Sequence, residues 1–169
     1  QSGFYYWVGK GAQLTQAMQD EGNVRAYYEA AAKAYPQVPV FANLARAEAM
    51  HENLLKTAAA RYGVTVEVIP VQAAVPATAA EALALAAKLE QEDIDMYAAL
   101  LKTPGLPQVL SLVFTQLQTA STRHLAATQF AGGRQGQPFG RGGRWNDGNA
   151  APRMPFCPAM PWNTAPQTP

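Results

Sequence analysis

Apolar residues recur every three to four positions along four stretches of the chain, and this spacing places them on one face of an α-helix. The first two helices are expected over residues 14–35 and 40–62. The third opens at Thr78 with a capping box, Thr-x-x-Glu, and ends before Pro104, while the fourth runs from about residue 107 to residue 132. The pattern therefore predicts an all-α fold of four long helices.

The segments that join these helices indicate how the helices are arranged. The connections after the first and third helices are short, so each of these helices should run antiparallel to the next one. The connection over residues 64–77 is longer, as the crossover between helices two and three of a four-helix bundle must be. Within it, residues 64–69 alternate apolar and polar side chains as a β-strand does, and residues 4–8 are also β-prone. These two segments could pair with each other or with a neighbouring subunit, or form a packed irregular arm.

Composition separates a folded body from a tail of different character. The 169 residues are 49% hydrophobic and 15% charged, which argues against disorder for most of the chain. The net charge of +1 gives no indication of a nucleic-acid partner, and no apolar run reaches the length of about 18 residues that a membrane span needs. Residues 132–169 hold seven of the 13 glycines, seven of the 13 prolines, and four arginines against one aspartate. We therefore expect an N-terminal arm (1–13), a bundle (14–131) and an extended basic Gly/Pro-rich tail (132–169).

Six ionisable residues interrupt the apolar faces of the predicted helices. They occupy positions that should point into the bundle: Glu21, Glu48, His51, Glu90, Asp93 and His124. Glu21, for example, lies seven residues after Leu14 and seven before Tyr28, on the same helix face. A buried carboxylate is costly unless it is paired or takes up a proton, so several that converge in one core indicate bound cations. Two divalent metal ions would balance the four carboxylates.

The sequence around these positions resembles the ferritin-like superfamily and, within it, the rubrerythrin- and erythrin-like branch of secreted or periplasmic domains. The resemblance covers about residues 14–131 and is carried by four stretches: 21–28, 39–51, 90–94 and 121–125. In that superfamily each half of the bundle supplies one Glu and one Glu-x-x-His motif, which together hold two iron or two manganese ions. Carried over, Glu21 with Glu48-x-x-His51 is the first half, and Glu90 is the Glu of the second half.

The fourth helix departs from this family pattern, because the expected Glu-x-x-His is Ser121-x-x-His124. Asp93 lies one turn after Glu90 on the same helix face and could supply the missing carboxylate. The resemblance then implies Glu48 and Glu90 as bridging ligands and Glu21 and Asp93 as terminal ones, with one histidine on each metal. A single metal, or a weakly bound second one, is the alternative.

Other polar residues near these positions have more ordinary expected roles. Tyr28 and Tyr97 lie one or two turns from the expected ligands, where they could pack in the core, donate hydrogen bonds to the ligands or act as redox-active phenols. Ser121 is expected to support the ligands in the same way. Three acidic residues fall on the outward side of their helices and are expected to be solvated: Glu52, Glu92 and Asp95.

The family resemblance implies a redox function. Carboxylate-rich ligation with few histidines suits iron and manganese. The resemblance implies oxidation of ferrous iron or reduction of oxygen or peroxide, so the chain could be a di-metal oxidoreductase of the ferroxidase or peroxidase type. No Cys-x-x-Cys pair is present, so the rubredoxin-type iron centre of rubrerythrins is missing, and a peroxidase would need an external electron donor.

The tail and the N-terminal arm suggest binding functions. Met154, Cys157 and Met160 place a thiolate between two thioethers, an arrangement that favours Cu(I), and a hydrophobic docking peptide is the alternative interpretation. Aromatic residues at both ends are candidate anchors on a partner subunit: Phe4, Tyr5, Tyr6, Trp7, Trp145, Phe156 and Trp162. Docking of both termini on neighbours would be a heterologous contact, which builds rings or filaments. We therefore expect a homo-oligomer or filament, and a filament subunit whose metal site is only stabilising is the alternative to an enzyme.

Two further features concern the compartment. The single cysteine, Cys157, excludes an intrachain disulfide and a Cys-rich zinc site. The chain starts at Gln1, which fits a mature secreted protein cut after a small residue and also fits a shortened chain. We expect a secreted or extracellular protein, with the periplasm as the alternative.

Overall fold

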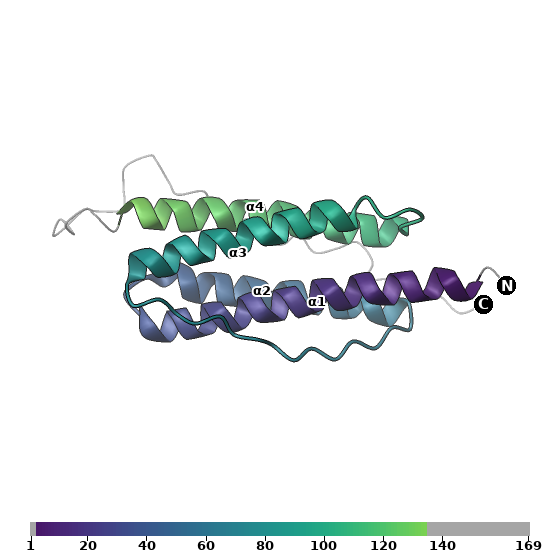
Figure 1. The fold of residues 1–169 in the computed structure, drawn as a ribbon, viewed down its shortest axis with the longest axis horizontal. Helices are drawn as coiled ribbons and strands as arrows, with labels where there is room; N and C mark the ends of the chain where they lie inside the picture. Colours follow the sequence, from purple (N-terminus) through teal and green to yellow (C-terminus); the bar gives the residue numbers. More distant parts are fainter. Residues whose placement is uncertain (1–2, 135–169) are drawn as a thin grey trace, which may run out of the picture. The chain divides into compact units, whose positions relative to one another are not determined.

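The computed structural model describes residues 3–134 of the chain, with the side chains of residues 11–133 (Figure 1). This part of the chain contains four helices and no strand: α1 (Gly3–Ala34), α2 (Pro39–Arg61), α3 (Ala79–Leu100) and α4 (Gln108–Arg134). The predicted all-α class and the number and order of the helices are confirmed. The tail residues named above, including the candidate copper ligands, lie outside the described residues.

The four helices pack side by side in two antiparallel pairs. α1 packs against α2 and α3 against α4, and contacts of α2 with α4 and of α1 with α3 join the two pairs. In Figure 1 the segment between α2 and α3 runs back along the helices, so that α3 begins at the end of the bundle where α2 also begins. This arrangement is compatible with a four-helix bundle that has one long crossover.

Local sequence signals explain where the helices begin and end. Pro39 opens α2, where a fixed φ and a missing N–H cost nothing. α2 ends in a Schellman motif, because Gly63 has a φ of 61° and the N–H of Val64 donates to the carbonyl of Ala59 at 2.9 Å. At the start of α3 the expected capping box is present, with Thr78 bonded to Glu81 in both directions.

The predicted N-terminal arm takes a different form from the one expected. α1 begins at Gly3 rather than near Leu14, so the backbone of residues 4–8 is helical, and the β-strand considered for them is not formed. Extending an existing helix adds one hydrogen bond per residue, whereas a new strand would need a partner. The side chains of the arm's anchor residues lie outside those that are described: Phe4, Tyr5, Tyr6 and Trp7.

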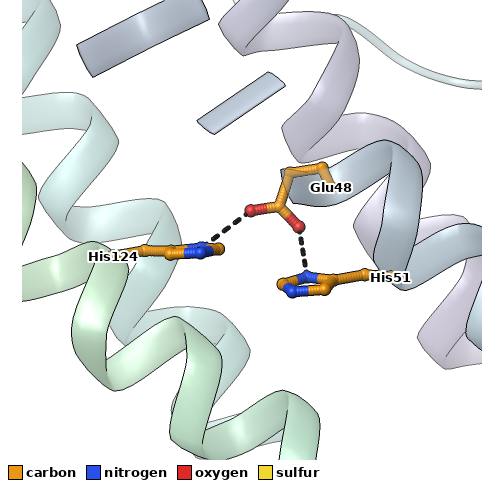
Figure 2. Close-up of side chains that lie close together, drawn as sticks. All are labelled: Glu48, His51 and His124. Atoms are coloured by element: carbon orange, nitrogen blue, oxygen red, sulfur yellow. Dashed lines mark hydrogen bonds and ion pairs between the residues drawn. The ribbon is translucent and has the colours of Figure 1, made fainter. Parts of the chain in front are cut away.

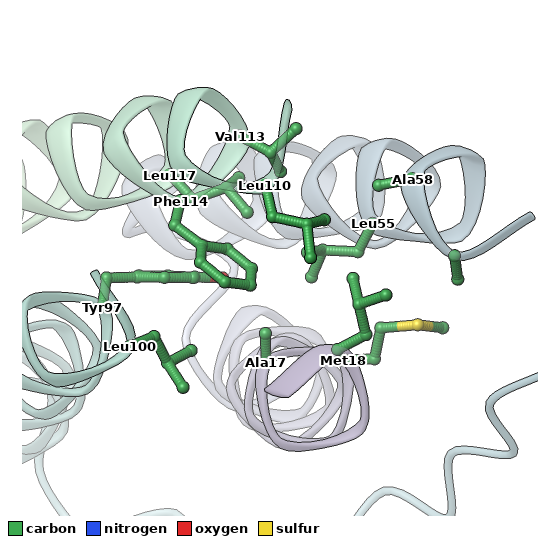
Figure 3. Close-up of a cluster of buried hydrophobic side chains, with 12 residues drawn as sticks. Ala17, Met18, Leu55, Ala58, Tyr97, Leu100, Leu110, Val113, Phe114 and Leu117 are labelled. Carbon is green, nitrogen blue, oxygen red and sulfur yellow. The ribbon is translucent and has the colours of Figure 1, made fainter. Parts of the chain in front are cut away.

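The core consists of two apolar clusters, one toward each end of the bundle. One cluster, shown in Figure 3, is built from Leu14, Met18, Leu55, Tyr97 and Phe114 with their neighbours. The other cluster has the following members: Val24, Tyr27, Tyr28, Ala31, Val38, Phe41, Leu44, Ala82, Leu83 and Ala86. On α1, α2 and α3 the candidate ligand positions lie between residues of the two clusters. On α4, His124 lies beyond Leu117, the last residue that this helix contributes to the first cluster. The apolar packing therefore encloses a layer of polar side chains.

Residues 64–69 of the crossover alternate as a strand does, but no strand forms within residues 3–134, which leaves the irregular packed segment as the form observed. Val64, Val66 and Val68 are half-buried and the residues between them exposed, so the alternation is real. The segment pairs with side chains of α1 instead of a second strand. The amide of Gln19 donates to the carbonyl of Ile69 at 2.7 Å, and the N–H of Val71 donates to Asn23 Oδ1 at 2.7 Å.

The crossover and α1 match in length. Tyr35, just beyond α1, donates through its hydroxyl to the carbonyl of Pro76 at 2.5 Å, and Val64 lies over Gly11. The extended chain from Val64 to Pro76 covers about 40 Å at ~3.3 Å per residue. The chain from Gly11 to Tyr35 covers about 36 Å at ~1.5 Å per residue. The crossover can therefore follow α1 in a nearly extended form from Gly11 to the end of the helix.

Glycine at position 22 permits a close approach between the crossover and α1. A Cβ built on Gly22 would lie 2.7 Å from Val68 Cγ1, which is too close, whereas a Cβ on Gly11 would lie 3.9 Å from Val64 Cγ1. Both glycines stand inside α1 and both face a valine of the crossover. They therefore form a matched pair for a test of this packing.

We expect Gly22→Ala to lower the melting temperature. Overpacking costs about 1–3 kcal/mol, which exceeds the gain of about 1 kcal/mol that alanine has over glycine in a helix. Gly11→Ala has room for its methyl group and should raise the melting temperature. Thermal denaturation of both variants checks this, and equal stabilisation by the two would contradict the close contact at Gly22.

Candidate metal centre

All six ionisable residues expected in the core are buried there, none of them more than 4% exposed. Each helix contributes at least one: Glu21 from α1, Glu48 and His51 from α2, Glu90 and Asp93 from α3, and His124 from α4. Helical spacing explains this, because each residue continues the apolar face of its own helix. The layer therefore draws on all four helices at one level of the bundle.

Glu48 lies between the two histidines (Figure 2). Its Oε2 is 2.8 Å from Nδ1 of His51, and its Oε1 is 3.0 Å from Nδ1 of His124. The two imidazole rings are nearly parallel, with centroids 5.2 Å apart. Each of these three residues offers one ligand atom, and these atoms lie within 4.8 Å of one another, so the group could hold a metal ion.

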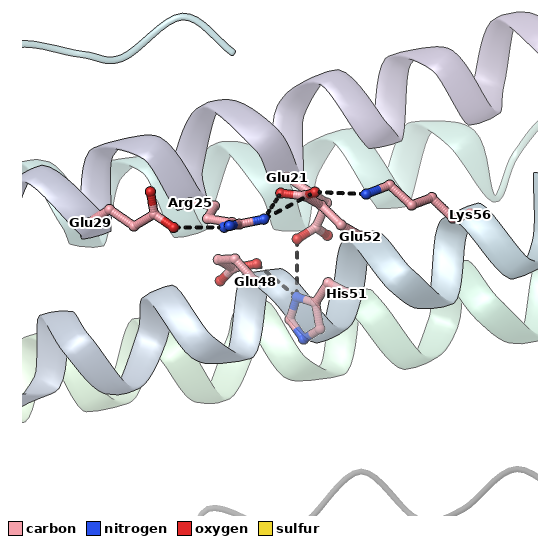
Figure 4. A network of polar contacts seen from close by, with 7 residues as sticks. All are labelled: Glu21, Arg25, Glu29, Glu48, His51, Glu52 and Lys56. Carbon is pink, nitrogen blue, oxygen red and sulfur yellow. Dashed lines mark hydrogen bonds and ion pairs between the residues drawn. The ribbon is translucent and has the colours of Figure 1, made fainter. Parts of the chain in front are cut away.

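A second carboxylate approaches each histidine from another helix. Oε2 of Glu21 is 3.0 Å from Nδ1 of His51, and Oε1 of Glu90 is 3.4 Å from Nδ1 of His124. Figure 4 shows Glu21 and Glu48 meeting at the same nitrogen of His51. The layer thus consists of two groups, each with one histidine and one glutamate of its own, which share Glu48.

Two buried tyrosines hold the outer glutamates of these groups. Tyr28 on α1 donates to Oε1 of Glu90 on α3 at 2.5 Å, and Tyr97 on α3 donates to Oε1 of Glu21 on α1. Each tyrosine lies seven residues after the glutamate of its own helix and bonds the glutamate of the other. Burial raises the pKa of both hydroxyl groups well above the ordinary value, so they remain protonated donors.

Several oxygen atoms in the layer have no hydrogen-bond donor. Both carboxylate oxygens of Asp93 and Oε2 of Glu90 are buried without a partner. Oε1 of Glu48 and Nδ1 of His124 are close, but not in the geometry of a hydrogen bond. Buried polar atoms are rarely left unsatisfied, and carboxylate oxygens with imidazole nitrogens are ligand atoms for divalent cations. The residues present therefore fit a metal centre.

Ser121 stands where the family pattern would have a glutamate, and it contributes no charge. The hydroxyl is buried and donates to the carbonyl of Leu117, one turn earlier in α4, at 3.2 Å. It was expected to support the ligands, but its hydrogen bond goes to its own helix. Asp93 is the additional carboxylate of the layer, because its charge acts on both Glu21 and Glu90.

Burial and neighbouring charges raise the pKa of some groups in the layer and lower the pKa of another. Burial, together with the charge of Glu48, raises the pKa of Glu21 to about 8, and burial beside Asp20 and Glu21 raises the pKa of Asp93 well above its ordinary value. Burial also opposes charge on Glu48, but the hydrogen bond from Glu21 and the positive charge of His51 hold its pKa well below the ordinary range. Without metal, the layer therefore keeps its charge on Glu48 and favours the protonated forms of Glu21 and Asp93.

Glu52 was expected to be solvated, and this prediction was wrong. It is only 8% exposed, and its carboxylate accepts from Arg25 at 3.3 Å and from Lys56 at 3.4 Å (Figure 4). A cavity of about 310 Å³ between α1, α2 and the crossover is lined by these three residues and by Val66 and Val68 of the crossover. Lys56 four residues after Glu52 was the available sequence signal. Glu92 and Asp95 are exposed, as expected.

The chain matches no family model, no curated protein and no solved structure. Among the helices described, none is both long enough and apolar enough to cross a membrane. The geometry of the buried layer is therefore the basis for the function proposed below.

We expect the melting temperature of the metal-free protein to fall as the pH rises from about 6 to about 9. The pKa of Glu21 is raised from 4.5 to about 8, so its contribution to stability is complete below pH 4.5 and is lost as the pH rises through 8. The pKa of His124 is raised from 6.5 to about 9, so its contribution is complete below pH 6.5 and is lost as the pH rises through 9.

Added Mn²⁺ should act in the opposite sense. Metal ligands must be deprotonated, so the rise in melting temperature on adding metal should be larger at pH 8 than at pH 6. Scanning calorimetry with and without Mn²⁺ measures both effects. A metal-free melting temperature that increases steadily over this range would contradict the assignment.

Proposed function

We propose that the chain is a ferritin-like protein whose helices hold two divalent metal ions, iron or manganese, in the buried layer. The observation that carries this proposal is the position of Glu48, which turns one carboxylate oxygen toward each histidine. A carboxylate in this position can bridge two ions about 3.5–4 Å apart. Glu21 beside His51 and Glu90 beside His124 support one ion on each side.

The ligand roles follow from these contacts. Glu21 and His51 would hold one ion together with Oε2 of Glu48, and Glu90 and His124 would hold the other together with Oε1. The charge of Asp93 interacts with both Glu21 and Glu90, and both of its oxygens lack a hydrogen-bond partner. We therefore assign Asp93 as the second ligand shared by the two ions. Glu90 contacts only one of the two histidines, which favours a terminal role for it instead of the bridging role that the family resemblance implied.

Charge and ligand type support iron or manganese. Four carboxylates balance two divalent ions, so the filled layer would carry no net charge into the core. Carboxylate oxygens and imidazole nitrogens are ligands that suit iron and manganese, whereas copper(I) prefers sulfur ligands. When bound, such a pair of ions supplies redox chemistry toward ferrous iron, oxygen or peroxide. Tyr28 and Tyr97 fix the terminal carboxylates in place, since ordered outer partners raise the affinity of a site.

We expect the parent protein to bind two equivalents of Mn²⁺, and Glu48→Gln to lose both. The amide keeps the shape of the side chain but removes the charge and one of the two ligand oxygens. The loss in affinity should exceed the roughly 10–100-fold that removal of a supporting residue costs. Isothermal titration calorimetry and metal analysis after dialysis measure the number of ions.

Glu52→Gln is the matched control for this experiment. Glu52 is also buried and on α2, but its carboxylate forms ion pairs with Arg25 and Lys56 and none with a histidine among the described residues. This variant should still bind two equivalents. Normal metal binding by Glu48→Gln would contradict the proposed centre, and one equivalent in the parent would indicate the single-metal alternative.

A further inference from the structure

A second group of carboxylates adjoins the centre where α1 meets α3. Asp20, the residue before Glu21, is half-buried, and its carboxyl group is near enough to Asp93 to help raise the pKa of that group. Asp93 is 1% exposed, and neither of its oxygens has a hydrogen-bond partner. The charges of Asp20, Glu21 and Glu90 all act on Asp93, so Asp93 has the half-buried Asp20 and two residues of the centre as neighbours.

The opposite side of α1 has a different charge pattern. There Arg25 and Lys56 pair with Glu52 and line the cavity under the crossover. Within residues 11–133, by contrast, neither Asp20 nor Asp93 forms an ion pair with a lysine or an arginine. Fixed positive charge repels a divalent cation and fixed negative charge attracts it. The α1–α3 side is therefore the favourable side for a cation to approach.

We propose that a divalent cation reaches the metal centre by an uptake route in which Asp20 binds the ion first and Asp93 receives it next. This inference rests on the proposed function. It adds that the metal ion enters the centre from solvent by a defined path, as a substrate would. Carboxylate oxygens can replace the water ligands of such an ion one by one as it moves from Asp20 to Asp93 and then to Glu21 and Glu90. Asp20 itself is not needed to hold the ion at the end of this route.

The test is the rate at which the metal-free protein takes up Co²⁺, followed by its visible absorption after rapid mixing. Asp20→Asn should slow uptake about 10-fold or more, because electrostatic attraction raises the association rates of charged ligands by 10–10³-fold. The number of ions bound at equilibrium should stay that of the parent. Asp95→Asn makes the same change of charge at an exposed position of α3 and should leave the rate within about twofold of the parent.

The outcomes distinguish failure of the uptake route from failure of the metal centre. Uptake by Asp20→Asn as fast as by Asp95→Asn overturns the uptake route and leaves the metal centre standing. Fewer bound ions at an unchanged rate make Asp20 a ligand and also overturn the route. A parent protein that binds no Co²⁺ overturns both the route and the proposed function. Asp20→Lys is a second variant for the same rate measurement, and uptake by it should be slower than by Asp20→Asn.

Discussion

Burial of charge is the constraint on which the rest of this structure depends. Six ionisable side chains, none more than 4% exposed, lie among apolar clusters that give their charges no solvation. Without metal, the protein meets this constraint by protonation, which is why the pKa of Glu21 rises to about 8 while Glu48 remains charged between two histidines. Two tyrosines satisfy one oxygen of each outer glutamate, but both oxygens of Asp93 lack any donor. A pair of divalent ions would resolve all of these conditions together.

The same layer relates the two halves of the fold. α1 and α3 each carry a glutamate with a tyrosine seven residues later, and each tyrosine reaches the glutamate of the other helix. α2 and α4 each bring one histidine to the middle, where Glu48 meets both. The crossover joins these halves, and its close approach to α1 needs the missing side chain at Gly22. The contacts that position the centre are thus also contacts that hold the helix pairs together.

Much of this could be predicted from the sequence, since helical periodicity alone places Glu21, Glu48, His51, Glu90, Asp93 and His124 in the core. Periodicity describes one helix at a time, and the failures arose where contacts between segments decide the outcome. The valines at 64, 66 and 68 alternate as in a strand, but their segment is held by Gln19 and Asn23 of a helix. Glu52 lies on the outer side of α2, but Arg25 and the crossover bury it. Which oxygen of Glu48 faces which histidine depends on all four helices, and no spacing along the chain gives it.

The central claim is that Glu48 lies between two metal ions. Anomalous X-ray scattering from crystals of the protein soaked in Mn²⁺ tests this directly. The account predicts two peaks about 3.5–4 Å apart on either side of the Glu48 carboxylate, one beside His51 and one beside His124. Crystals that show no peak in the buried layer, with metal only at surface carboxylates, would contradict it.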